Sequence, residues 1–264
     1  MSTVIIKEEN GILNITLNRP EIHNAFNPEM ISELTMVFSD QNFSMKNRAV
    51  VLKGEGESFC AGADLNWMKS MMKFNFEENV ADAQRLYTMF DVMKNCPVPV
   101  IGKIHGNVFG GGLGLVAICD IVAADEKTKF CFSEAKLGLV PSVISPFVSR
   151  KMSPHILREL FLTADVFDAE KALSSGLIHF SGSNSKCDKY LEEKIQSIRK
   201  CGKGALITTK KLLNDLEHLN LQETKAETTT VISRRRVSEE GQEGLRAFLE
   251  KRKPSWIVEN TKKQ

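Results

Sequence analysis

The sequence predicts an α/β fold, because strand-like and helix-like segments alternate through its first two-thirds. Two further observations agree with this. Glycine-rich turns interrupt the chain where such segments meet, and the composition, with 42% hydrophobic and 26% charged residues, is that of an ordinary globular protein. Beyond about residue 150 the pattern becomes almost wholly helical.

Two strands and a helix are expected first. Residues 4–7 and 12–17 are β-like runs around the turn residues Asn10-Gly11, and apolar and polar residues alternate in the second run. Asn27 suits a helix N-cap, since the proline and glutamate after it favour the first helical turn. The apolar face of that helix contains Ile31, Leu34 and Phe38.

The central part is expected to contain three more strands, at 49–52, 97–104 and 118–123. A helix is predicted over 77–95, and an apolar helix after the glycines at 110–112. The apolar face of the first of these helices carries Leu86, Met89, Phe90 and Met93.

Helices are predicted for the last third. Asp168 can cap one that Gly176 ends, and others cover roughly 186–201, 204–217 and 221–251. Their apolar faces could pack on a neighbouring subunit or on the chain's own core.

Charge and cysteine content exclude several classes of protein. The net charge of +2, from 35 basic and 33 acidic residues, is too small to indicate a nucleic-acid partner, although the C-terminal third is moderately basic. The six cysteines lack C-x-x-C or zinc-ligand spacing, so we expect free thiols and no metal. There is no apolar run of membrane-spanning length and no signal-peptide pattern, and we therefore expect a soluble cytoplasmic protein.

Two segments could bind a ligand through their backbone. Small residues dominate the loop 58–65, which could bind an adenine edge or a carbonyl oxygen; taken alone, a tight structural loop is somewhat favoured. The segment 106–114 exposes glycine N–H groups at a helix N-terminus, where an anion is favoured, but it matches neither a Walker loop nor a dinucleotide fingerprint. Together the two segments could give one N–H each to a single oxygen, an oxyanion hole suited to a thioester enolate.

Glu134 is the candidate acid or base, because it lies in a semi-apolar stretch where burial would raise its pKa toward neutrality. The alternative is a salt bridge with Lys136 or an exposed surface position, and from the sequence alone this alternative is favoured. His105 lacks a partner nucleophile and is interpreted as structural.

Two cysteines and an aromatic residue near these segments are also interpreted as structural. Cys60 and Cys119 are expected to be small buried apolar residues. Trp67 is expected to form a pocket wall or part of the core.

Taken together, these segments resemble the crotonase (enoyl-CoA hydratase/isomerase) superfamily, over about residues 4–253. The matching motifs are Leu17-Asn18-Arg19-Pro20, Phe59 to Leu65, His105-Gly106 through Gly112, Ser133-Glu134, and Gly244 to Arg252. The resemblance implies a spiral of ββα units, here residues 1–195, and a C-terminal helical region, 196–264, that builds trimers, often paired into hexamers.

A coenzyme A thioester is the substrate class that the resemblance implies, with no separate cofactor. The N–H groups of Ala63 and Gly111 would form the oxyanion hole, and Glu134 would be the catalytic acid/base. The other implied CoA and substrate contacts are His23, Ala61, Asp64, Leu65, Asn66, Gly110 and, from the next subunit, Phe248 and Lys251.

One departure from the family pattern concerns catalysis. Ordinary hydratases carry two glutamates; the second matches Glu134, whereas the first falls at Gly114. The usual Gly-x-Gly-Gly-Thr is also replaced, at 141–148. With Asp64-Leu65-Asn66-Trp67-Met68, these departures resemble the bacterial methylglutaconyl-CoA hydratases of leucine and isoprenoid-acid breakdown. A glutamate at position 114 would repel the distal carboxylate of such a substrate, so we expect glycine to remove the repulsion and leave room for a methyl branch.

The sequence therefore predicts a hydratase that adds water to a branched unsaturated acyl-CoA such as 3-methylglutaconyl-CoA. An enoyl-CoA isomerase with Glu134 as its single acid/base is the first alternative. A non-catalytic CoA- or RNA-binding protein is the second alternative, and the near-neutral charge argues against RNA.

Overall fold

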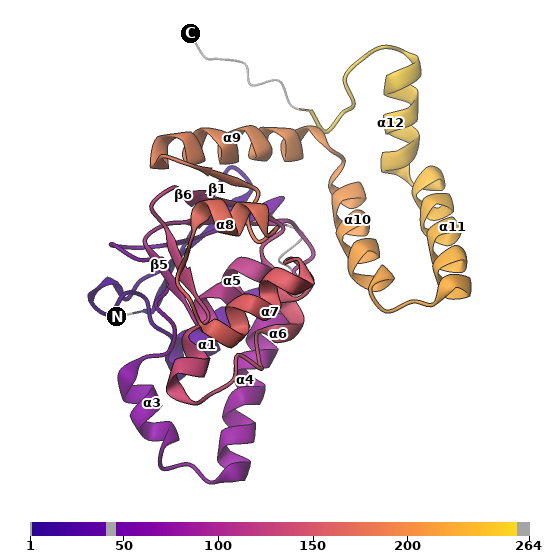
Figure 1. Ribbon diagram of the computed structural model, residues 1–264. Coiled ribbons are helices and arrows are strands. Elements are labelled where there is room, and N and C mark those ends of the chain that lie inside the picture. Colours follow the sequence, from indigo (N-terminus) through magenta and orange to yellow (C-terminus); the bar gives the residue numbers. More distant parts are fainter. Residues whose placement is uncertain (1, 41–45, 258–264) are drawn as a thin grey trace. The chain divides into compact units, whose positions relative to one another are not determined.

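The computed structural model describes residues 2–40 and 46–257 of the 264-residue chain. Two compact units divide it, residues 1–192 and residues 193–264. The first unit contains the strands and the segments that carry the candidate site (Figure 1). Helix α9 (Asn184–Lys200) crosses the division between the units.

A six-stranded sheet forms the centre of the first unit, in the order β1-β2-β3-β4-β6-β9. Strands β1 and β2 pair antiparallel and every later neighbour is parallel. The strands are β1 (Val4–Glu9), β2 (Ile12–Leu17), β3 (Ala49–Gly54), β4 (Val100–Ile104), β6 (Ile121–Asp125) and β9 (Phe180–Gly182). The central strands are nearly continuous apolar runs because both of their faces are covered.

A smaller sheet, in the order β5-β7-β8, lies in the same unit. Its strands are β5 (Asn107–Phe109), β7 (Lys129–Cys131) and β8 (Phe167–Asp168). Strand β5 directly precedes helix α5, and β7 directly precedes the turn that carries Glu134. This sheet therefore places two of the predicted site segments next to each other.

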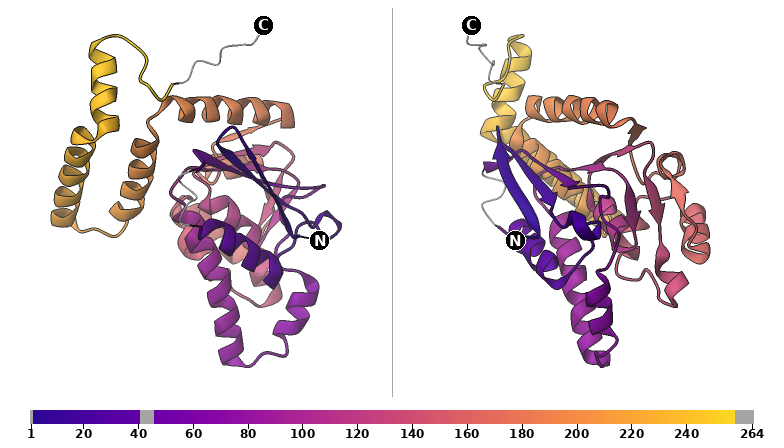
Figure 2. Two further views of the ribbon diagram at one scale, coloured as in Figure 1. Left: turned by 180° about the vertical axis from the view of Figure 1, so that it is seen from behind. Right: turned by 90° about the vertical axis from the view of Figure 1, so that its left-hand side faces the viewer.

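Helices of the first unit pack against these sheets, and α3 and α4 project from the same end of the unit (Figures 1 and 2). The helices are α1 (Pro28–Phe38), α3 (Leu65–Met71), α4 (Phe76–Lys94), α5 (Gly111–Ile118), α6 (Ser145–Val148), α7 (Pro154–Thr163) and α8 (Ala169–Ser174), with short 3₁₀ turns at Pro20–Ile22 and Ser133–Leu137. The predicted cap of α1 is confirmed, since the Asn27 side chain accepts a hydrogen bond from the Met30 N–H at 2.8 Å. The Asp168 cap of α8 is confirmed in the same way.

Several predicted boundaries were wrong for identifiable reasons. Strand β4 starts only at Val100, because Pro97 and Pro99 have no N–H to give to a ladder. The apolar run predicted as a strand from residue 118 begins in α5, and β6 starts at Ile121. Short strands β8 and β9 interrupt the region expected to be wholly helical, and α3 was not predicted.

The second unit contains α10 (Lys203–Leu216), α11 (Leu221–Val237) and α12 (Glu239–Leu249). The helix predicted over 221–251 breaks at Ser238, which has extended backbone angles and caps α12 by accepting from the Gly241 N–H. A Cβ at Gly241 would lie 1.9 Å from the Arg235 carbonyl oxygen, so only glycine permits this sharp turn. The carboxylate of Glu240 accepts hydrogen bonds from the Gly204 and Ala205 N–H groups and also pairs with Arg235.

Candidate active site

The loop that carries Ala63 lies against strand β5. The Cys60 N–H donates to the Asn107 carbonyl at 3.3 Å, and the Phe109 N–H donates to the Cys60 carbonyl at 3.0 Å. A Cβ at Gly112 would lie 2.5 Å from the Cys60 carbonyl oxygen, so glycine is needed for the loop and the start of α5 to approach this closely. The two backbone segments predicted to act together are therefore neighbours.

Ala63 is oriented by a short bridge to Phe26. The Phe26 N–H donates to the Gly62 carbonyl at 2.7 Å, and the Asp64 N–H donates to the Phe26 carbonyl at 2.8 Å. Since successive residues of an extended segment direct their backbone groups to opposite sides, the Ala63 N–H points away from Phe26. In the part of the chain that the structure describes, this N–H makes no backbone hydrogen bond.

Gly111 is the first residue of α5, where backbone N–H groups have no partner inside the helix. The preceding Gly110 has a φ of +49° and gives its own N–H to the Cys131 carbonyl at 2.9 Å. That hydrogen bond ties the start of α5 to β7. The Gly111 N–H thus lies at the positive end of a helix dipole, beside the loop of Ala63.

Glu134 lies in the 3₁₀ turn directly after β7, next to this helix terminus. A Cβ built on Gly110 would be 3.2 Å from Glu134 Oε1. The other carboxylate oxygen, Oε2, is buried and has no hydrogen-bond partner among the described residues. Burial raises the pKa of Glu134 above its ordinary value of 4.5. The alternative of an ion pair with Lys136 is not formed in the described part of the chain.

The surroundings of Gly114 contradict the expectation of free room at this position. A Cβ there would lie 2.6 Å from Phe90 Cζ and 2.7 Å from Ile144 Cγ2, well inside normal contact. Both side chains are buried, and Phe90 packs in turn on Phe26 and Phe147 at ring separations of 6.2 and 5.6 Å. Glycine is therefore required by packing, and the space beside it is filled by apolar side chains.

Asp64 has a structural role in addition to its predicted place near the ligand. Its carboxylate pairs with Arg19 at 2.6 Å and accepts from the Asn66 N–H at 2.7 Å, which caps α3. Burial alone would raise the pKa of Asp64, but these hydrogen bonds and the positive charge of Arg19 lower it overall. Leu65 and Asn66 are exposed on the first turn of α3.

His23 and Ala61 meet through the backbone. The Ala61 N–H donates to the His23 carbonyl at 3.0 Å, and His23 Nδ1 lies 3.2 Å from Ser58 Oγ. His23 has a φ of +54°, a conformation that few residues other than glycine adopt. Phe248 and Lys251 belong to the second unit, where both are exposed at the end of α12.

The residues expected to be structural have structural contacts. The His105 Nε2–H donates to the Gly56 carbonyl at 2.9 Å. Cys60 and Cys119 are fully buried, and burial raises the pKa of the Cys60 thiol to about 12. The sequence did not indicate Phe26 and Phe90 as site residues. The apolar face predicted for the helix over 77–95 indicated that Phe90 is buried, but not that it lies against Gly114.

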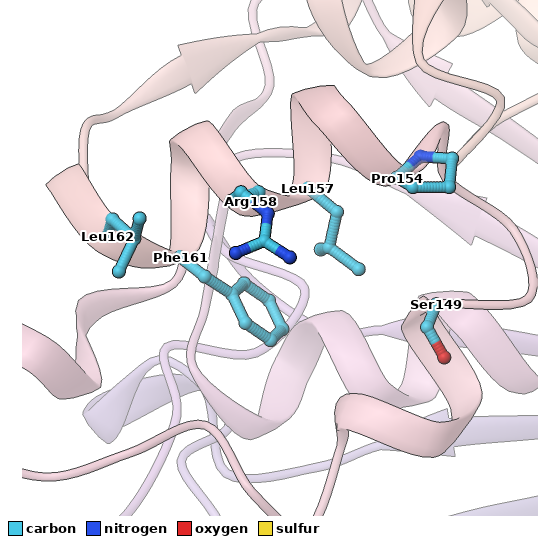
Figure 3. A pocket seen from close by; sticks show the side chains of 6 residues that line it. All are labelled: Ser149, Pro154, Leu157, Arg158, Phe161 and Leu162. Carbon is cyan, nitrogen blue, oxygen red and sulfur yellow. The ribbon is translucent and has the colours of Figure 1, made fainter.

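A separate pocket of about 320 Å³ opens on the surface of the first unit between α6 and α7 (Figure 3). In Figure 3 the Leu157, Arg158 and Phe161 side chains extend from α7, and Ser149 lies on the neighbouring segment. Its lining residues are Ser149, Pro154, Leu157, Arg158, Phe161 and Leu162. It includes none of the predicted site residues.

Two further properties concern the described residues as a whole. No helix among them is both long and apolar enough to cross a membrane. They also contain no group of three or more His, Cys, Asp or Glu side chains arranged to hold a metal ion.

Known proteins identify the class to which this fold and site belong. The enoyl-CoA hydratase/isomerase family profile matches residues 7–259. A "Putative enoyl-CoA hydratase" of Thermus thermophilus is 30% identical over 247 residues, which cover 94% of this chain and 98% of the relative. The chain therefore belongs to the enoyl-CoA hydratase/isomerase family.

Solved structures agree with this assignment. An enoyl-CoA hydratase from Shewanella pealeana is 40% identical with a TM-score of 0.91, and 96% of each chain is covered. Pseudomonas aeruginosa AtuE is 32% identical with a TM-score of 0.93, covering 97% of this chain and 100% of that one. The predicted α/β fold class is confirmed.

Proposed function

We propose that this enzyme adds water to an α,β-unsaturated acyl-CoA thioester and that Glu134 is its catalytic acid/base. One observation carries the proposal: the half-buried Glu134 carboxylate, with a raised pKa and a buried oxygen that has no partner among the described residues, lies beside a helix terminus and a loop. In the described part of the chain the N–H groups of Gly111 and Ala63 there make no backbone hydrogen bond. A carboxylate in such surroundings is suited to proton transfer near neutral pH.

In the proposed reaction the thioester oxygen accepts hydrogen bonds from the N–H groups of Ala63 and Gly111. Negative charge develops on this oxygen as water adds to C3, and the two donors stabilise it. Glu134 takes a proton from the attacking water and delivers one to C2, so that the product is a 3-hydroxyacyl-CoA and the carboxylate returns to its starting state. One carboxylate then performs both transfers.

The acyl group that we propose is a branched glutaconyl group such as 3-methylglutaconyl. The support is the sequence pattern Asp64-Leu65-Asn66-Trp67-Met68 together with the glycine at 114. The methyl branch of the substrate cannot be placed beside Gly114 as we expected from the sequence, because Phe90 and Ile144 fill that space. The branch would have to lie elsewhere along the bound acyl chain.

The experiment is a spectrophotometric comparison of 3-methylglutaconyl-CoA and crotonyl-CoA, following the conjugated thioester. We expect hydration of both and a clear preference for the branched acid. Preference for crotonyl-CoA would contradict the acyl assignment. Absence of turnover with either substrate would contradict the hydratase and favour the isomerase or a non-catalytic CoA-binding protein.

Double-bond isomerisation is the second candidate, and the apolar packing at Gly114 favours it. Migration of a double bond needs one carboxylate to move one proton, whereas Phe90 and Ile144 occupy the place where a second carboxylate would stand. Turnover in ¹⁸O-labelled water separates the two candidates, because hydration incorporates the label into the product and isomerisation does not.

The remaining site residues belong to the proposed CoA site and assembly. We propose that His23, Ala61 and Leu65, with Phe248 and Lys251 of a neighbouring copy, contact the nucleotide end of the substrate, in a trimer or a pair of trimers. Light scattering of the purified protein would give the assembly. A monomeric mass together with full activity would contradict the contribution of Phe248 and Lys251 from a second copy.

A further inference from the structure

Trp67 buries a hydrogen-bond donor that has no acceptor. It is the buried residue of α3, with 6% of its surface exposed. Its indole Nε1 is buried and meets no hydrogen-bond partner in residues 2–40 and 46–257. An indole nitrogen can only donate, and buried donors in folded proteins are nearly always paired. This donor therefore indicates an acceptor that the described residues do not provide.

The place of Trp67 in the fold connects it with the reacting end of the site. Helix α3 starts directly after Ala63 and Asp64, and the Asp64 carboxylate holds its first turn by accepting from the Asn66 N–H. The same carboxylate is fixed by Arg19, which also donates to the Ala25 carbonyl at 2.6 Å. The indole is thus attached, within one helical turn, to the loop that presents the Ala63 N–H.

The other tryptophan of the chain gives a contrast. Trp256, in the second unit, donates its Nε1–H to the Lys200 carbonyl at 3.1 Å. Its donor is satisfied by the protein although the residue is more exposed. The chain contains two tryptophans, so the unpaired donor is a property of the Trp67 position.

The charge of α3 indicates which acceptor would be tolerated. The helix has the sequence LNWMKSM, which contains no acidic residue and carries Lys69 in its last turn. Met68 and Met71, on the same helix, are half-buried. The one carboxylate at the start of this helix, that of Asp64, is paired with Arg19. A hydrogen bond to a charged acceptor is stronger than one to a neutral acceptor.

We propose that the Trp67 Nε1–H donates a hydrogen bond to an oxygen at the far end of the acyl group, and that this oxygen belongs to a carboxylate. The proposal rests on the proposed function, in which Ala63 and Gly111 hold the thioester oxygen and Glu134 moves the protons. Trp67 is then a specificity residue, because it distinguishes unsaturated acyl thioesters that end in a carboxylate from those that end in a methyl group.

The test replaces Trp67 by phenylalanine, which keeps an aromatic ring and removes the N–H. Two substrates are compared, 3-methylglutaconyl-CoA and 3-methylcrotonyl-CoA, which share the branched enoyl unit and differ in the distal carboxylate. We expect kcat/KM of Trp67→Phe to fall on the order of 10–100-fold for the first, mainly through KM, and to stay within about threefold for the second. Trp256→Phe is the control and should leave the ratio of the two substrates unchanged.

A binding measurement provides a readout that does not depend on turnover. In Trp256→Phe the remaining tryptophan is Trp67, so its emission reports directly on the indole. We expect a saturable change of emission with the saturated analogue 3-methylglutaryl-CoA and a much smaller one with isovaleryl-CoA. This experiment still decides the question if Trp67→Phe does not fold.

The outcomes separate the two proposals. Equal losses on both substrates, or no loss on either, would overturn the role of Trp67, as would identical emission changes with the two analogues. If the unmodified enzyme hydrates neither substrate, the proposed function fails, whereas selective binding of the carboxylated analogue would still uphold the assignment of Trp67.

Discussion

The start and the middle of helix α5 place glycines in very different surroundings. At its start, Gly110 lies beside the Glu134 carboxylate, one oxygen of which has no protein partner among the described residues. One turn later, Gly114 lies against Phe90 and Ile144, whose atoms leave no room even for a methyl group. Glycine therefore gives access to the backbone at the start of the helix and allows close packing in its middle.

This difference separates function from stability within a single helix. An unpaired buried carboxylate lowers the free energy of unfolding, and such arrangements are found where a ligand or a reaction needs the group. Dense apolar packing raises the free energy of unfolding and fixes the helix in place. Variants at the two positions should consequently affect different properties, activity at the start of the helix and folding in its middle.

The largest expected effect is on activity at the start of α5. We predict that Glu134→Gln lowers turnover at least about 100-fold, because the amide cannot accept and return a proton; this corresponds to about 2.7 kcal/mol of transition-state stabilisation. Steady-state assays with an enoyl-CoA substrate, with circular dichroism to verify folding, provide the measurement. Near-normal turnover would remove Glu134 from the mechanism. Lys136→Gln, two residues away and exposed, is the control and should retain activity.

The next effect is on stability, in the middle of α5. We predict that Gly114→Ala lowers the free energy of unfolding by about 1–3 kcal/mol, because its Cβ would meet Phe90 and Ile144. Urea unfolding measures the change. If the clash with Phe90 is the cause, the penalties of Gly114→Ala and Phe90→Leu should be less than additive in the double variant. A Gly114→Ala protein as stable as the parent would show that the packing adjusts freely.

A related comparison distinguishes sterics from charge at the same position. Gly114→Glu adds both bulk and a carboxylate, whereas Gly114→Ala adds bulk alone. We expect neither variant to change the ratio of activities on 3-methylglutaconyl-CoA and crotonyl-CoA, since packing and not the substrate's charge requires glycine here. Selective loss on the carboxylated substrate in Gly114→Glu alone would restore the electrostatic explanation.

The smallest effect concerns pH. Burial raises the pKa of Glu134 above 4.5, and the proposed base must be deprotonated, so kcat/KM should fall as the pH drops through a midpoint above 4.5. The folded state binds this proton more tightly than the unfolded state, which means that the charged carboxylate destabilises the fold at neutral pH. Glu134→Gln should therefore raise the melting temperature at pH 7 by roughly 1–3 °C, and the gain should vanish well below pH 4.5. A lower melting temperature of Glu134→Gln at pH 7 would contradict this.

Local signals in the sequence were sufficient for much of the fold. The caps at Asn27 and Asp168 were recognisable because a short polar side chain satisfies N–H groups two or three residues away. The glycine turn before α5 was recognisable because glycine readily adopts a positive φ, as Gly110 does at +49°. By contrast, the break at Ser238 was missed, since α11 and α12 together read as one continuous helical pattern. The extended backbone of Ser238 and its cap on the Gly241 N–H separate the two helices.

The sequence by itself determined the α/β class, the family and the candidate acid Glu134, because these depend on motifs whose residues are close together along the chain. Only the tertiary structure decided that Gly114 is enclosed by Phe90 and Ile144, that Glu134 forms no ion pair with Lys136 in the described residues, and that the Trp67 donor is buried without an acceptor. These properties depend on which segments, far apart in the sequence, pack against one another in the fold. Side chains from α4, α5 and the turn after β7 meet only in the folded protein, and a local sequence pattern does not predict such contacts.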